Sequence, residues 1–146
     1  MLKLDEIIDM WQEDKVVDET SAHTALLNIP ILHGKYLEIL SKHRIRALKV
    51  KFDYSRMKQI RREYFLGNLD KETLDEYGWE PFQLALGNKA NIDIYLEADD
   101  NLIKLLEKKA YHEECVQVCE TILKELNSRT FQLREYLQHS RFLAGN

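Results

Sequence analysis

Helix-breaking residues are scarce in this chain, and their scarcity limits the folds it can adopt. Only five glycines and two prolines occur among 146 residues. Between residues 31 and 66 there is no proline, and Gly34 is the only glycine. Such a stretch favours one long helix that ends at Gly67. We therefore predict an all-α fold in which long helices form a small bundle, as a single helical domain over residues 1–146.

Apolar periodicity places the other helices. Asp18 is a candidate N-cap for the second of them, and Pro30 should bend or restart the chain at its end. Asn127 and Ser128 are expected to break the C-terminal helical region. The helices predicted besides the one at 31–66 cover residues 2–12, 21–29, about 97–126 and 130–143.

Residues 67–91 concentrate three glycines and one proline, so we predict a long loop there. One helical turn is expected at Lys71–Glu76. The segment Ile92–Leu96 alternates in polarity, but a helix start is favoured over a strand because no partner strand is evident. Trp79 and Phe82 flank Pro81, and we expect them to pin the loop to the core rather than to stack on bases.

An apolar seam is predicted in the C-terminal half, because its members recur at helical spacing. His112, Cys115 and Cys119 lie within the seam and could be imagined as zinc ligands. We favour core packing, since no fourth ligand is evident nearby, and we expect no metal and no other cofactor. The seam comprises His112, Cys115, Val116, Cys119, Ile122, Leu123 and Leu126.

No catalytic constellation is evident. Phosphate-binding glycine loops and the common hydrolase and zinc-protease motifs do not occur in the sequence. Acidic pairs such as Glu113-Glu114 and Asp99-Asp100 are typical of solvated helix faces. We therefore expect a binding protein and not an enzyme. A signal segment and apolar runs approaching 18 residues are also lacking, so we expect neither secretion nor a membrane span, and the two cysteines suit a reducing cytoplasm.

Charge is strongly segregated along the chain. The net charge is −4, yet residues 42–62 carry +8 and the remainder −12, and Asp53 is the only acid of this basic window. On a helical wheel the cations form two rows, with Ile45, Leu48 and Phe52 between them as the expected packing face. One row is Lys42, Arg46, Lys49 and Arg56, and the other is Arg44, Lys51, Lys58 and Arg62.

Two functions account for these rows about equally well. The cations could neutralise the phosphates of single-stranded nucleic acid, with the interleaved Tyr54, Tyr64 and Phe65 stacking on bases. Alternatively, the basic helix could dock an acidic protein partner, as in a structural interaction protein. A metal-dependent enzyme using His112 and the cysteines is a third and weaker hypothesis. Known duplex-DNA motifs are not recognisable.

Several strings, taken together and in order, resemble one family over nearly the whole chain. The strings are Trp11-x-x-Asp14, Val17-Asp18-x-Thr20, Ile29-Pro30-x-Leu32-His33-x-Lys35-Tyr36-Leu37, Glu63-Tyr64-Phe65-x-Gly67-x-Leu69, Gly78-Trp79-Glu80-Pro81-Phe82, Ala98-Asp99-x-x-Leu102-Ile103 and Asn127-x-Arg129-Thr130-Phe131-Gln132. Together they resemble the UvsY recombination mediator proteins of T-even-type bacteriophages.

This resemblance implies a non-enzymatic protein of DNA recombination and repair that binds single-stranded DNA. It implies self-association into a ring of six or seven subunits. It also implies a role in helping the phage recombinase to displace the phage single-strand-binding protein, in the cytoplasm of the infected host cell. The family's basic DNA-binding positions lie just before its acidic-aromatic-aromatic triplet, which places them here at residues 58–62.

We therefore predict that Lys58, Arg61 and Arg62 contact single-stranded DNA, supported by Lys51 and Tyr64. Arg61 matches a basic position of the family directly, whereas Gln59 stands where the pattern has a lysine. Oligomerisation is assigned to the helices at about 97–143. Besides the seam, this region offers Phe131, Leu133, Tyr136 and Leu137 as apolar surface.

Overall fold

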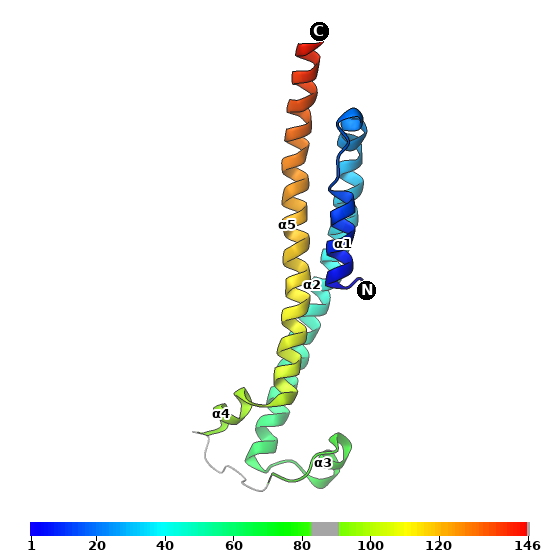
Figure 1. The fold of residues 1–146 in the computed structure, drawn as a ribbon. Helices are drawn as coiled ribbons and strands as arrows, with labels where there is room; N and C mark the ends of the chain where they lie inside the picture. The colour runs from blue at the N-terminus through cyan, green and yellow to red at the C-terminus, as the bar shows by residue number, and fades with distance from the viewer. Residues whose placement is uncertain (83–90, 146) are drawn as a thin grey trace. The chain divides into compact units, whose positions relative to one another are not determined.

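A computed structural model describes residues 1–82 and 91–145, and these residues fold entirely as helices joined by short links (Figure 1). The all-α prediction is confirmed, and the described residues contain no strand. None of their helices is both long and apolar enough to pass through a bilayer. The elements are α1 (Leu4–Asp14), a short 3₁₀ turn η1 (Glu19–Ser21), α2 (Ala22–Leu66), α3 (Lys71–Tyr77), α4 (Ile92–Glu97) and α5 (Asp100–Leu143).

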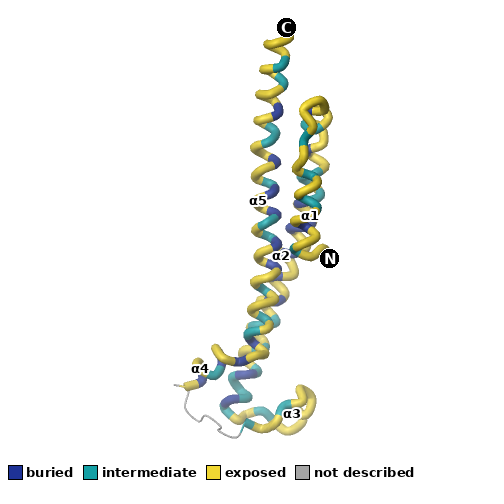
Figure 2. Tube along the Cα trace, in the orientation of Figure 1, coloured by how far each residue is buried: buried dark blue, intermediate teal, exposed yellow. Residues whose placement is uncertain are grey.

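The chain divides into two compact units. The first consists of Met1–Ile45 together with Tyr111–Asn146, and the second of Arg46–Ala110. In the first unit, α1 lies along the N-terminal part of α2 and the C-terminal part of α5 (Figure 2). The assignment of the whole chain to one domain stays a prediction.

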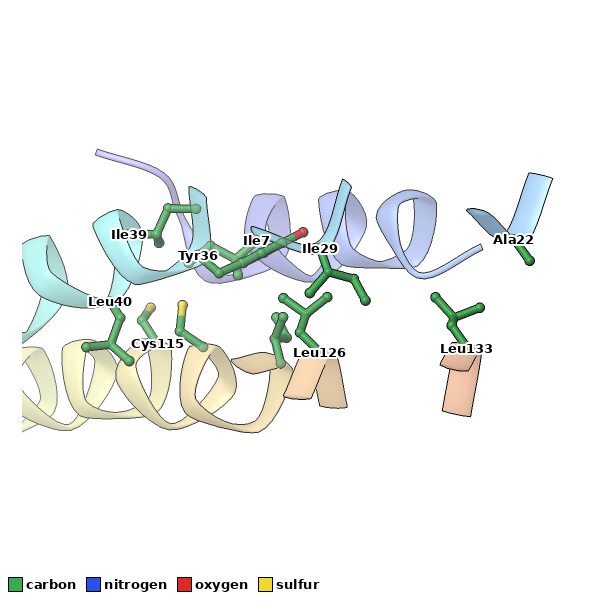
Figure 3. Close-up of a cluster of buried hydrophobic side chains, with 11 residues drawn as sticks. Ile7, Ala22, Ile29, Tyr36, Ile39, Leu40, Cys115, Leu126 and Leu133 are labelled. Atoms are coloured by element: carbon green, nitrogen blue, oxygen red, sulfur yellow. The ribbon is translucent and has the colours of Figure 1, made fainter. Parts of the chain in front are cut away.

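The core of the first unit is the seam predicted from the sequence (Figure 3). Cys115, Cys119, Ile122 and Leu126 of α5 are fully or almost fully buried, and Val116 and Leu123 pack beside them. Burial raises the pKa of the Cys119 thiol to about 11, and burial also raises that of Cys115. The side chains that meet the seam from α1 and α2 are Ile7, Ala22, Ile29, Tyr36, Ile39 and Leu40.

Asp14, at the end of α1, fastens this helix to α2. Its carboxylate accepts hydrogen bonds from Lys35 Nζ at 2.7 Å and from the Tyr36 hydroxyl at 2.8 Å. Burial alone would raise the pKa of Asp14, but the hydrogen bonds from Lys35 and Tyr36 outweigh it and lower that pKa. Trp11 meets the buried Tyr36 ring edge-on, with centroids 5.7 Å apart. These contacts explain why α1 can remain so short.

The predicted restart at Pro30 and the predicted break at Asn127 and Ser128 are wrong. α2 runs through Pro30 from Ala22 to Leu66, and α5 runs through Asn127 and Ser128 to Leu143. An interior proline costs about 3 kcal/mol, but Ile29 and Tyr36 are buried on either side of it, and each contributes about 1.5–3 kcal/mol. Continuity of the buried seam therefore outweighs the local penalties. In α5, Leu126 and Leu133 are buried on either side of Asn127 and Ser128, and their burial likewise favours an unbroken helix.

Two buried histidines face one another in the first unit. His43 Nδ1 and His112 Nδ1 are 2.9 Å apart, and His43 Nε2 lies 2.8 Å from the Leu2 carbonyl oxygen. A carbonyl can only accept, so Nε2 of His43 carries a proton, and in the neutral ring Nδ1 is then the atom that accepts from His112. The described residues contain no group of three or more histidine, cysteine or acidic side chains arranged to hold a metal ion.

The second unit has a smaller core of Phe65, Ile92, Leu96 and Leu102. The helical turn expected at residues 71–76 is present as α3, and Ile92 begins α4, as favoured over a strand. Asp70 caps α3 by accepting from the Thr73 N–H at 2.8 Å, and Gly78 ends it in the left-handed conformation at φ 71°. Part of the predicted loop, residues 83–90, lies outside the described residues.

Candidate nucleic-acid interface

In the second unit, α2 turns a compact apolar face inward. Ala47, Val50 and Phe65 are buried there, and Tyr54 and Met57 are half-buried. The packing face expected from the wheel is therefore wrong, because Ile45, Leu48 and Phe52 are 70%, 50% and 54% exposed. The basic window has apolar residues on two faces of the helix. The larger ones, Ile45, Leu48 and Phe52, led to the wrong expectation. The smaller side chains Ala47 and Val50 are the buried ones, and small side chains allow helices to approach closely.

Four cations on the two flanks of the second half of α2 are unpaired within the described residues. Arg46, Lys49, Lys51 and Arg56 are exposed, and their side chains form no hydrogen bond or ion pair with any described residue. Asp53, the one acid in the window, does not neutralise them. Unpaired cations at this density repel one another in the free protein and are available to a polyanion.

Lys58 and Arg62, by contrast, have acidic neighbours. Lys58 lies 6.0 Å from the centroid of the Tyr54 ring and borders a pocket of about 390 Å³ that Asp93 and Glu97 also line. Arg62 is 3.8 Å from Asp93, in a loose pair whose acid is 76% exposed. Exposed pairs of this kind are worth little and are readily exchanged for another anion. Both cations therefore remain accessible to phosphate.

Arg61 points into the protein. Its Nε donates to Asp99 Oδ2 at 2.6 Å, and its guanidinium carbon lies 4.3 Å from the Tyr64 ring centroid and 4.5 Å from that of Trp79. Arginine is suited to such a position because its planar group can stack on rings while it pairs with a carboxylate. Of the five residues predicted to contact DNA, Arg61 is the one whose charge is neutralised inside the fold.

Tyr64 anchors the segment after α3. Its hydroxyl donates to the Glu80 carbonyl oxygen at 2.7 Å, and its ring contacts Trp79 and Phe82 at centroid distances of 5.4 and 5.7 Å. Phe82 packs against the core of the second unit, as predicted, and Trp79 packs on the Tyr64 ring. The structure thus brings together Lys58, Arg61, Arg62 and Tyr64 in the last turns of α2, with Lys51 earlier on the same helix.

Sequence reasoning missed the role of Asp99 at this site. In the sequence Asp99 stands in an acidic pair, typical of a solvated helix face, and in one of the family strings. It lies just before α5, where its Oδ1 accepts from the Asn101 N–H at 3.2 Å. An aspartate directly before a helix is a recognisable N-cap signal, but nothing in the sequence indicates that the other carboxylate oxygen meets Arg61.

Comparison with known proteins places the chain among recombination proteins. Residues 10–146 match the family described as "Recombination, repair and ssDNA binding protein UvsY". A comparison with curated protein sequences gives no match.

The fold resembles crystal structures of the bacteriophage T4 recombination mediator protein UvsY. For lattice type II the TM-score is 0.84 at 19% identity, covering 99% of this chain and 99% of that chain. For lattice type IV it is 0.78 at 18% identity, covering 97% and 98%, and for lattice type I it is 0.79 at 19% identity, covering 92% and 96%. At these identities the likeness establishes a shared fold.

Proposed function

Because this chain belongs to the UvsY family of recombination, repair and single-stranded-DNA-binding proteins, we propose that it binds single-stranded DNA through the outward face of the second half of α2. The observation that carries this proposal is a set of exposed cations that have no partner among the described residues, with Lys49 and Arg56 on one flank of the helix and Lys51 on the other. Cations that neutralise backbone phosphates release condensed counterions, and that release drives binding. Lys58 and Arg62 extend the surface by exchanging weak acidic neighbours for phosphate.

Arg61 enters this proposal as a positioning residue. Its bond to Asp99 and its contacts with Tyr64 and Trp79 hold the last turns of α2 in place. The flanking Lys58 and Arg62 are then presented outward from a fixed backbone. Loss of Arg61 would therefore weaken DNA binding through the geometry of its neighbours.

We further propose a recombination mediator that performs no catalysis. Such a protein would hold single-stranded DNA while the phage recombinase replaces the phage single-strand-binding protein, in the cytoplasm of the infected host cell. Binding energy alone can drive this exchange. Several basic surfaces acting on one flexible strand gain effective concentration, so each contact can be weak and reversible while the whole assembly holds firmly.

Assembly into a homo-oligomer of six or seven subunits is part of the same proposal. Phe131, Phe142 and Leu143 of α5 are 67%, 77% and 71% exposed, an unusual amount of large apolar surface for a helix end. A second copy of the chain could cover these side chains. Each ring would then repeat the basic surface once per subunit.

Salt-dependent binding to a fluorescent poly-thymidine strand tests the function. Lys58→Ala combined with Arg62→Ala should weaken binding and reduce the slope of log affinity against log salt by about 1.4, since each single-strand phosphate contact contributes about 0.7. Lys108→Ala with Lys124→Ala is the matched control, because it removes equal charge from exposed sites outside the basic window. If both pairs behave alike, an acidic protein partner becomes the better explanation of the basic helix.

A further inference from the structure

Phe52 occupies an unusual position for a large apolar side chain. It is 54% exposed, whereas Val50, about half a helical turn away, is 1% exposed. Phe52 therefore lies on the ridge of α2 opposite the buried face. Within the described part of the chain its ring contacts no other aromatic ring and no cation.

The surroundings of Phe52 are cationic. Lys49 and Arg56 stand three residues before and four residues after it, so they lie on one flank of Phe52, and Lys51 lies on the other flank. All three are exposed and form no hydrogen bond or ion pair with the described residues through their side chains. An exposed ring bordered by free positive charges matches the alternation of bases and phosphates along a single strand.

We propose that Phe52 is a nucleobase-stacking position at the centre of the DNA-binding surface, with Lys49 and Arg56 on the adjoining phosphates. This inference rests on the proposed function and adds a subsite to it. A duplex hides its base faces in the stack, whereas a single strand exposes them, so stacking on Phe52 would favour single strands. The cations attract the phosphates of single-stranded and duplex DNA alike, and the Phe52 ring adds a preference for the single strand.

The aromatic cluster at the end of α2 is less suited to this task. Tyr64 is held by its hydrogen bond to Glu80 and by contacts with Phe65, Trp79 and Phe82. Admitting a base there would require these contacts to part. Phe52 needs no such rearrangement.

The test compares Phe52→Leu and Phe52→Tyr on two strands of equal length, poly-thymidine and an abasic strand that keeps the phosphates. Leucine retains apolar bulk but lacks a flat ring. Phe52→Leu should weaken poly-thymidine binding about tenfold, within the range known for base–aromatic stacking. Its salt slope should be unchanged, because no phosphate contact is lost. Phe52→Tyr should bind as the wild type does.

The abasic strand separates stacking from charge. Phe52→Leu should bind it as tightly as the wild type, whereas Lys49→Ala with Arg56→Ala should weaken binding to both strands and lower the slope by about 1.4. Equal binding of poly-thymidine by Phe52→Leu and wild type would overturn the inference. So would a fall in the native mass of Phe52→Leu without DNA, which would place Phe52 in a subunit contact. If the wild type itself fails to bind poly-thymidine, the proposed function fails, and the subsite with it.

Discussion

Arg61 Nε donates to Asp99 Oδ2 over 2.6 Å, in an ion pair whose side chains are only 10% and 3% exposed. The pair joins the last turns of α2 to the residue that precedes α5. The second carboxylate oxygen is also used, since it accepts from the Asn101 N–H. Neither charge is left without a partner, so each depends on the other for its place in the interior.

Removal of Arg61 should therefore destabilise the protein strongly. Arg61→Met leaves the Asp99 charge buried and unpaired, and we expect a loss of about 3–5 kcal/mol in urea unfolding. Adding Asp99→Asn should recover part of it, because asparagine can still cap α5. Exposed Arg56→Ala should cost less than about 0.5 kcal/mol. An Arg61→Met protein as stable as Arg56→Ala would remove the positioning role.

Acid should weaken the attachment of α1 through Asp14. Its pKa is lowered in the folded protein, so its contribution is fully present above the unfolded value of about 3.9 and is lost as pH falls through the lower folded value. Asp14→Asn should lower the free energy of unfolding by about 1–2 kcal/mol at pH 7. The figure is kept small because Lys35 is partly exposed, so solvent screens its attraction for Asp14. Thermal unfolding from pH 7 to pH 3 should then show a shallower acid decline for the variant. Parallel curves for the two proteins would contradict this.

The two thiols should resist alkylation in the native state. Cys119 has a pKa of about 11 and is fully buried, so only about one molecule in a thousand carries its thiolate at pH 8. Cys115 is buried beside it in the same seam, and burial raises its pKa as well. Iodoacetamide labelling followed by mass spectrometry should show neither cysteine modified until urea unfolds the chain. Rapid labelling of either cysteine without urea would mean that the seam opens easily.

The exposed phenylalanines of α5 should govern assembly. Phe131→Ser with Phe142→Ser removes large apolar side chains from the surface, and we expect a smaller native mass because less apolar area remains to be buried between copies. Gln132→Ser with Gln138→Ser, also exposed on α5, is the matched control and should keep the full mass. Light scattering measures both. An unchanged mass for the phenylalanine variant would shift the subunit contact elsewhere.

The C-terminal seam was predictable from sequence because its residues repeat at helical spacing and offer no competing face. Cys115 and Leu126 are buried as that pattern indicates. The basic window has two apolar faces. Periodicity could not reveal that Ala47 and Val50 would be buried while Leu48 and Phe52 stay exposed. Arg61 illustrates another limit. Its family position suggested a contact with DNA, but a partner 38 residues away in sequence determines where its charge lies.

The tautomers of the facing histidines have a consequence for motion. A rotation of the His43 ring would withdraw its Nε2 proton from the Leu2 carbonyl and its Nδ1 acceptor from His112 at once. Neither hydrogen bond can break through ring rotation without the other. The His43 ring therefore links the Leu2 carbonyl to His112 of α5, and a turn of this one ring releases both contacts together. A second tether joins the same segments, because the Leu4 N–H donates to the Tyr111 hydroxyl of α5 at 3.0 Å.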